Sequence, residues 1–260
     1  MDMIDPVALL HPFRTELWLP RYRAGRWGPW SMRVVPIAAT RGYWGRVYPI
    51  RGLPALTGPT DAGVATWMSI VPMEMESQAI GIGAAYGHTA VMGLGMGWCA
   101  ANVALNPAVE RVTVVERDPA VVALIADLGV FAQLPSEIAA KIAIVEADAF
   151  TWRPDAAVDS LQIDIWPRIM APDRWDDVRR MQDAIGAASL YFWGQELELW
   201  RLAARADGRV PDTIDRARLD ALVASTALPL VLGDDPDLPA TIVEAARWWT
   251  PRRDGWWSEG

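Results

Sequence analysis

The chain has 260 residues, of which 52% are hydrophobic and 22% are charged, and its formal net charge is −8 at pH 7. This composition is typical of a globular protein of one large or two small domains, and it excludes a disordered chain. The acidic balance argues against a nucleic-acid partner, while one cysteine and two histidines exclude an internal disulfide and argue against a metal site.

The N-terminal residues 1–60 are predicted to form a small β-rich region. Residues 30–37 and 43–50 are rich in β-branched and aromatic side chains and are bounded by glycine and proline, which is typical of a hairpin or small sheet. The first six residues contain acids and a proline, so we expect no signal peptide and a cytoplasmic protein. Residues 61–85 are predicted to form a helix that leads into the next domain.

From residue 61 to 206 the pattern predicts a Rossmann-like α/β domain with a mostly parallel sheet and helices on both faces. Apolar runs that read as strands alternate with helical segments; the strands are 89–94, 111–116, 142–146, 158–165 and 187–193, and the helices are 98–105, 119–128, 174–185 and 196–206. Residues 207–260 are predicted to form a mostly helical extension, in which 228–232 could be a strand or a buried loop.

The uncharged stretch 77–109 is long enough to suggest a membrane span. It contains several glycines, a histidine and a proline, and a Gly-x-Gly-x-Gly turn lies in its middle. A strand, a turn and a helix inside a globular core explain it better, and we expect no membrane association.

Chemistry-bearing residues gather at the predicted carboxyl ends of the strands. The glycine turn follows the first strand at Gly93, Gly95 and Gly97. Glu116 ends the second strand, Asp148 follows the third, and Asp164 lies at the end of the fourth. Open α/β sheets bind ligands at this edge, glycines allow close backbone approach, and an acid after the second strand can accept both hydroxyls of a ribose. The series predicts a nucleotide-type ligand.

The dinucleotide fingerprint places its third glycine one position later, where this chain has Trp98, and that argues against a nicotinamide cofactor. The turn, the acid after strand two and Asp-Ala-Phe after strand three instead resemble the class I S-adenosylmethionine-dependent methyltransferases. The resemblance implies S-adenosylmethionine as cofactor. The implied contacts are the methionine part on the turn from Gly93 through Met96 to Gly97, the ribose on Glu116 with Arg117, and the adenine on Asp148 with Ala149.

Within that superfamily, residues 30–200 look most similar to the spermidine synthases, through the second-strand segment 109–122 and the motif 146–150. Two departures weaken that resemblance. The family carries an acid inside the glycine turn, where this chain has Met96, and a second strand-four acid where this chain has Pro167. Met96 favours the intact cofactor, whose carboxylate an acid would repel.

We therefore expect a small-molecule methyltransferase that works by in-line methyl transfer. Asp164 is the first candidate to accept a proton from the acceptor, and Glu76 is a second. Glu74 and Trp166 are candidates for substrate binding, although Glu74 and Glu76 could equally be solvated residues of a helix end. An aromatic face at Trp166 could hold a sulfonium or an amine.

Three alternatives remain open at this point. They are an aminopropyltransferase of polyamine synthesis, a non-catalytic module that binds the cofactor or partner proteins, and a nicotinamide-dependent dehydrogenase. A homodimer is implied by the resemblance alone. The tryptophan pairs at 248–249 and 256–257 suggest a docked tail or a dimer contact.

Overall fold

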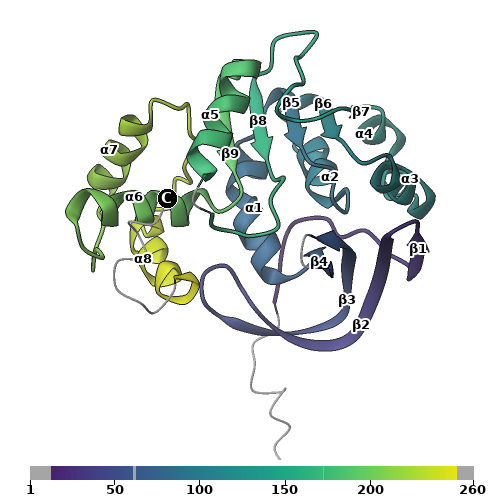
Figure 1. Cartoon of the computed structure of the whole chain (residues 1–260), viewed down its shortest axis with the longest axis horizontal. Coiled ribbons are helices and arrows are strands. Elements are labelled where there is room, and N and C mark those ends of the chain that lie inside the picture. The colour runs from purple at the N-terminus through teal and green to yellow at the C-terminus, as the bar shows by residue number, and fades with distance from the viewer. Residues whose placement is uncertain (1–12, 61–62, 172, 251–260) are drawn as a thin grey trace, which may run out of the picture.

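The computed structural model describes residues 13–60, 63–171 and 173–250 of the chain. These residues form a five-stranded parallel sheet with helices around it and a four-stranded antiparallel sheet near the N-terminus (Figure 1). A helical segment follows the larger sheet. The predicted α/β class, with a small β-rich region first and a helical tail last, is confirmed.

The parallel sheet has the strand order β7-β6-β5-β8-β9. Its strands are β5 (Gly87–Met92), β6 (Val109–Glu116), β7 (Ile142–Glu146), β8 (Ser160–Ile163) and β9 (Ser189–Phe192). The chain runs outward from β5 to β7 on one side and then returns to build β8 and β9 on the other. The strand order therefore reverses between β5 and β8, where open α/β sheets form a ligand-binding crevice at their carboxyl edge.

Helices cover both faces of this sheet because its strands are apolar on both faces. Val91 of β5 packs in a core with the side chains of α1 (Pro72–Ala84), α2 (Trp98–Leu105) and α3 (Pro119–Leu128). Its neighbours Ala90 and Met92 point to the opposite core, which contains α5 (Arg174–Ile185). The short η2 (Phe131–Gln133) and α4 (Ser136–Ala139) connect α3 to β7.

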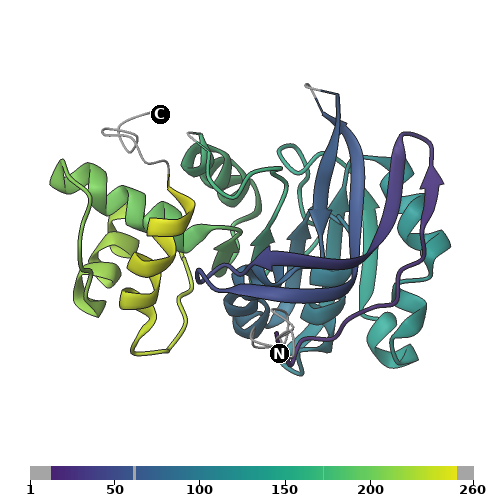
Figure 2. The same ribbon diagram turned by 90° about the horizontal axis from the view of Figure 1, so that it is seen from below.

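The antiparallel sheet consists of β1 (Gly25–Trp27), β2 (Trp30–Arg41), β3 (Val47–Thr60) and β4 (Gly63–Ser69), in that order. Its long β2–β3 ribbon crosses below the parallel sheet in Figure 1 and is seen along its length in Figure 2.

The prediction of one helix over residues 61–85 is wrong in its first part. Strand β4 pairs with β3, with Met68 opposite Leu56, and the helix α1 starts only at Pro72. Proline is favoured in the first turn of a helix because the amide hydrogen that it lacks has no intrahelical partner there. Pairing with the long strand β3 thus determines the structure of residues 63–69.

The C-terminal helices α6 (Gln195–Asp207), α7 (Arg216–Thr226) and α8 (Leu238–Trp249) gather at one end of the molecule (Figures 1 and 2). Residues 228–232 form no full strand, and a single parallel bridge joins Leu230 to Leu190 of β9. Trp249 docks on the β2–β3 ribbon, where its indole donates a hydrogen bond to the Tyr43 carbonyl at 2.7 Å. The pair 256–257 lies outside the described residues.

Among the helices that the structure describes, none has both the length and the apolar composition that crossing a membrane requires.

Candidate functional site

A cavity of about 310 Å³ opens at the carboxyl edge of the parallel sheet. Its lining includes residues that follow four strands of that sheet, from Gly93 after β5 to Glu116 at the end of β6, Asp148 after β7 and Asp164 after β8. The residues that the sequence singled out at separate strand ends therefore meet around one space. Its size is in the range of small-molecule sites.

The glycine turn forms the part of the cavity nearest β5. Gly93 and Gly95 line it, with φ angles of +96° and +49°. A Cβ atom on Gly93 would lie 2.3 Å from the backbone oxygen of Asp164, so only glycine lets the turn approach the end of β8 this closely. Gly97 precedes α2 and lies outside the lining.

Met96 does not line the cavity, in contrast to its expected place at the cofactor. Its side chain is fully buried in the core that α2 and α3 share. Its amide donates to the Met68 sulfur at 3.0 Å, and its carbonyl accepts from the Tyr22 hydroxyl at 2.8 Å. Met96 thus ties the turn to the N-terminal region, and its side chain does not reach the space where a cofactor carboxylate would lie.

Glu116 lies at the end of β6 and faces the turn. One carboxylate oxygen accepts from the Leu94 amide at 3.0 Å, and the other accepts from the Asp118 amide at 2.9 Å. A carboxylate has about four acceptor sites, so both oxygens keep the capacity to accept ligand hydroxyls. Arg117, the next residue, also lines the cavity.

Asp148 and Ala149 line the cavity beyond β7. Asp148 closes a turn on itself, because its side chain accepts from the Phe150 amide at 2.8 Å. Ala149 is buried and presents a small apolar surface beside this carboxylate. A carboxylate next to a small apolar surface is an arrangement that suits the polar edge and the flat face of a purine ring.

The antiparallel sheet supplies a wall that the sequence did not predict. Trp30 of β2 and Trp67 and Met68 of β4 line the cavity. The Trp30 indole donates to a carboxylate oxygen of Asp118 at 2.8 Å, and the other oxygen of Asp118 caps α3. Because residues 61–69 were expected to be helical, no sequence signal placed Trp67 or Met68 at this site.

Helix α1 directs two polar side chains into the cavity, Glu74 and, one turn later, Gln78. Residues four apart share one face of a helix. The Gln78 amide donates to a carboxylate oxygen of Asp164 at 2.8 Å, and its own oxygen lies 3.9 Å from the Cys99 sulfur. Gln78 was missed from the sequence, although its spacing from Glu74 would have indicated it.

Asp164 is largely desolvated, and this burial raises its pKa to about 7, against the opposing effects of the Arg174 charge and the Gln78 hydrogen bond. The same desolvation, reinforced by the Asp164 charge, raises the pKa of Glu74 well above its usual range. The side chain of Glu74 is 5% exposed. A pair of desolvated carboxyl groups, in which the Asp164 charge raises the pKa of Glu74, can accept and release a proton near neutral pH.

Glu76 lies outside this pair. Residues two apart on a helix point in nearly opposite directions, and Glu76 faces the β2–β3 ribbon. One of its oxygens accepts from the Trp44 amide at 3.1 Å, and the other accepts from the Tyr48 hydroxyl at 3.2 Å. The structure gives Glu76 a position that anchors the ribbon to α1.

Trp166 lines the cavity from the segment that follows β8, and its ring is held from two sides. Its indole donates to Asp177 of α5 at 2.8 Å, and the Arg174 guanidinium lies 3.8 Å from the ring centroid. Arg174 also donates to the carbonyl groups of Arg168 and Trp193. This buried cation fixes the segment that carries Asp164 and Trp166.

Cys99 borders the cavity, but burial and the nearby charges of Asp164 and Glu74 raise the pKa of its thiol far above its usual range. A thiol in this state is a poor nucleophile. Trp98 is buried behind the turn, where its indole donates to the Trp18 carbonyl at 2.8 Å, and it does not line the cavity.

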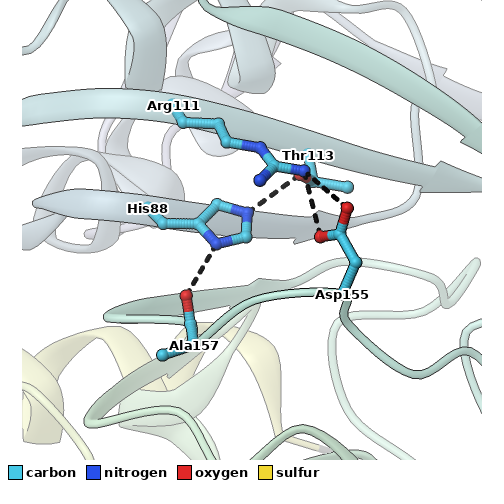
Figure 3. Close-up of polar contacts among 5 residues, drawn as sticks. All are labelled: His88, Arg111, Thr113, Asp155 and Ala157. Carbon is cyan, nitrogen blue, oxygen red and sulfur yellow. Dashed lines mark hydrogen bonds and ion pairs between the residues drawn. The ribbon is translucent and has the colours of Figure 1, made fainter.

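His88 lies at the amino end of β5 and is not part of the cavity lining. Figure 3 shows its polar contacts. Its Nδ1 lies 2.7 Å from the Ala157 carbonyl and its Nε2 lies 2.9 Å from the Thr113 hydroxyl. The carbonyl can only accept, so Nδ1 donates to it, and the Thr113 hydroxyl can pair with Nε2 as donor or as acceptor. The nearby Arg111–Asp155 ion pair at 3.1 Å covers this end of the sheet. Both ring nitrogens are used, which makes His88 a structural residue.

The described residues include no group of three or more histidine, cysteine, aspartate or glutamate side chains arranged to hold a metal ion.

Comparisons with known proteins give partial structural similarities. Neither a family model nor a curated protein sequence matches this chain. The complex of DhpI with SAH is 18% identical with a TM-score of 0.30, and the match covers 42% of this chain and 47% of that one. The glycopeptide N-methyltransferase MtfA complexed with S-adenosyl-L-homocysteine is 18% identical with a TM-score of 0.33, covering 42% and 41%. The 23S rRNA methyltransferase ErmE is 16% identical with a TM-score of 0.33, covering 43% and 42%.

The matched part spans less than half the length of each of these three chains. None of the three is named as a spermidine synthase, so the closer resemblance to that branch gains no support from them.

Proposed function

We propose that this protein is a methyltransferase that uses S-adenosylmethionine and acts on a small molecule. The observation that carries the proposal is the convergence of the glycine turn, Glu116, the pair Asp148–Ala149 and Asp164 on one cavity at the strand-order reversal of a parallel sheet. Each of these groups offers a different kind of contact, and together they match the parts of this one ligand.

The residues present fit such a ligand. Glu116 keeps acceptor capacity for two ribose hydroxyls, beyond the two backbone amides that it already binds. Ala149 and Asp148 would contact the adenine, and the backbone of Gly93 and Gly95 would approach the methionine part without side chains in the way.

S-adenosylmethionine supplies a methyl group that its sulfonium already activates, so the protein has to position the acceptor and exclude water. Well-oriented reactants gain up to about 7–11 kcal/mol of the barrier in this way. The aromatic wall of Trp67 and Trp166 and the buried end near Glu74 provide such a dry, shaped surface. The cavity of about 310 Å³ favours a small acceptor.

In this proposal, Asp164 accepts the proton that the acceptor loses. Its backbone packs against Gly93 of the turn, and its carboxyl lines the cavity. With a pKa raised by burial to about 7, it can exchange a proton with the acceptor at neutral pH. General-base assistance of this kind contributes about 10²–10⁴-fold to a rate.

The test is calorimetric titration of the protein with S-adenosylmethionine, its decarboxylated form and NAD, repeated on Glu116→Ala. We expect S-adenosylmethionine to bind best, and its affinity to fall in the variant by about 10- to 100-fold as hydrogen bonds to a charged acceptor are lost. Glu110→Gln is the matched control, because this exposed carboxylate lies near the amino end of β6, away from the cavity. Preference for NAD or for the decarboxylated form would overturn the proposal.

A further inference from the structure

Carboxyl groups outnumber basic groups in the lining of the cavity. Six carboxyl side chains line it among the described residues, and the one guanidinium in the lining is that of Arg117. Arg117 follows Glu116, whose carboxylate holds the glycine turn, so this cation lies beside β6 and not beside α1. The end of the cavity between α1 and β8 is therefore the end that would attract a cation.

Two residues in this end have incomplete interactions, Glu74 of α1 and Gln162 of β8, whose side-chain oxygen is buried without a hydrogen-bond partner among the described residues. Glu74 is 5% exposed and lines the cavity, and no described residue donates a hydrogen bond to its carboxyl group. Desolvation and the Asp164 charge are the two influences on its pKa, and both raise it. A largely buried carboxyl group to which no described residue donates gains a partner from a ligand that supplies N–H groups.

Asp164 faces the same space and is only partly satisfied. Gln78 donates one hydrogen bond to one of its oxygens, and the Arg174 charge acts on it from behind the cavity wall. Gln78 also separates this carboxylate from the Cys99 thiol. The Asp164 charge thus raises the proton affinity of Glu74, which comes from a different element, and both carboxyl groups line the same cavity.

Aromatic side chains also line the cavity. Trp67, Trp166 and Trp193 line the cavity, and each ring is fixed. Trp67 packs edge-on against Trp30 at 5.8 Å, Trp166 is held by Asp177, and the Trp193 indole donates to the Ser77 hydroxyl at 2.9 Å. Indole faces attract cations and pack against flat apolar groups.

We propose that the methyl acceptor is a small amine on an apolar or aromatic skeleton, and that its nitrogen binds between the carboxyl groups of Glu74 and Asp164. This inference rests on the proposed methyltransferase function and names the substrate class of that site. An alcohol or a carboxylic acid would leave the carboxyl pair without a positive partner, and a carboxylic acid would add a third negative charge.

The reaction balances with these groups. An amine that arrives protonated gives one proton to the carboxyl pair, and the neutral nitrogen then forms the bond to the methyl carbon while the carbon–sulfur bond breaks. The sulfur keeps the bonding electron pair and becomes a neutral thioether. The nitrogen gains a positive charge, which the carboxylates balance, and the first proton leaves to solvent. The net products are the N-methylammonium, S-adenosylhomocysteine and one proton.

Sinefungin tests the charge of this position without knowledge of the acceptor. It is an analogue of the methyl donor in which a carbon-bound amine replaces the sulfonium methyl group, and that amine is protonated at neutral pH. S-adenosylhomocysteine has a neutral sulfur at the same place. We expect sinefungin to bind about 10- to 100-fold more tightly than S-adenosylhomocysteine, as for a charge-assisted hydrogen bond. The ratio of the two affinities should fall toward one in Glu74→Gln and in Asp164→Asn.

The control is Glu110→Gln, which removes one exposed carboxylate near the amino end of β6 and should keep the preference. Equal affinities for the two analogues in the natural protein, or a preference that survives in both variants, would overturn the assignment. If neither analogue binds the natural protein, the proposed function itself fails, which is a different result. The melting temperature of each variant separates a lost contact from a lost fold, and Asp164→Asn serves where Glu74→Gln does not fold.

A second titration tests the acceptor class directly. The protein saturated with S-adenosylhomocysteine is titrated with a panel of small amines that includes phenethylamine and tryptamine, each beside the alcohol of the same skeleton. We expect amines to bind at least about tenfold better than their alcohols, and Glu74→Gln to remove the difference. A panel in which no amine exceeds its alcohol contradicts the proposal.

Discussion

Asp164→Asn should raise stability and lower activity at the same time. Asparagine has nearly the same shape, and its carbonyl oxygen can still accept the hydrogen bond from Gln78. The substitution removes a carboxylate whose charged form is penalised by burial. Glu74 of α1 and the Cys99 thiol of α2 face this carboxylate, and the Arg174 charge of α5 and the Gln78 hydrogen bond oppose the penalty. Rates of methyl transfer should fall by about 10²–10⁴-fold because the proton acceptor is lost.

The size of the stability gain follows from proton linkage. The pKa of Asp164 is raised from 3.8 to about 7. Between these two pH values the folded protein keeps a proton that the unfolded chain releases. The free energy of unfolding of the natural protein therefore falls as the pH rises toward 7, by at most about 4 kcal/mol in all. About 2 kcal/mol of this decline lies above pH 5.5. The variant has no titratable group at this position, so its free energy of unfolding does not fall with pH for this reason.

The assay is urea unfolding of both proteins at pH 5.5 and pH 8.5. The advantage of Asp164→Asn over the natural protein should be larger at pH 8.5, by about 1–2 kcal/mol once relaxation of the site is allowed for. Titrations of groups that do not interact with Asp164 cancel in this difference. Glu74 and Cys99 act in the same direction as Asp164, because loss of the Asp164 charge lowers the pKa of each in the variant. An advantage that is constant or shrinks as the pH rises would refute the assignment of a raised pKa to Asp164.

Three further substitutions test the packing of the site. Gly93→Ala should lower the free energy of unfolding by at least about 2 kcal/mol in a urea titration. The φ of +96° disfavours alanine, and the added Cβ would lie 2.3 Å from the backbone oxygen of Asp164. An unchanged unfolding midpoint would show that the backbone of the turn can shift to accept the Cβ. Trp30→Phe removes the hydrogen bond to Asp118 and should cost about 0.5–1.5 kcal/mol in thermal unfolding, and a larger loss would point to packing instead. Glu76→Ala leaves a backbone amide and a phenol hydroxyl without their acceptor and should lower the free energy of unfolding by about 1–3 kcal/mol by the same measurement. An unchanged stability would contradict the anchoring position of Glu76.

Much of the larger sheet could be predicted because its strands are short apolar runs that end in recognisable residues. Glu116 and Asp164 follow such runs, and parallel strands bring their carboxyl ends to one edge. The bounds of α2 and α3 matched their predictions, since a glycine precedes one helix and an Asp-Pro pair starts the other.

The rest depended on information that lies far apart in the chain. Residues 63–69 form a strand because β3 offers a pairing edge, and local preference did not reveal it. The direction of Met96 follows from the left-handed glycines around it and from its partner Met68. The sequence alone could have shown that Glu74 and Glu76 point in different directions, because residues two positions apart on a helix do not share a face.

The most direct test of the proposed site is a crystal structure of the protein with S-adenosylhomocysteine. We expect the ribose hydroxyls on Glu116, the adenine beside Ala149, and the sulfur directed toward Asp164 and Glu74. A ligand bound with its sulfur toward Asp148, or bound outside this cavity, would contradict both the assigned contacts and the place of the acceptor.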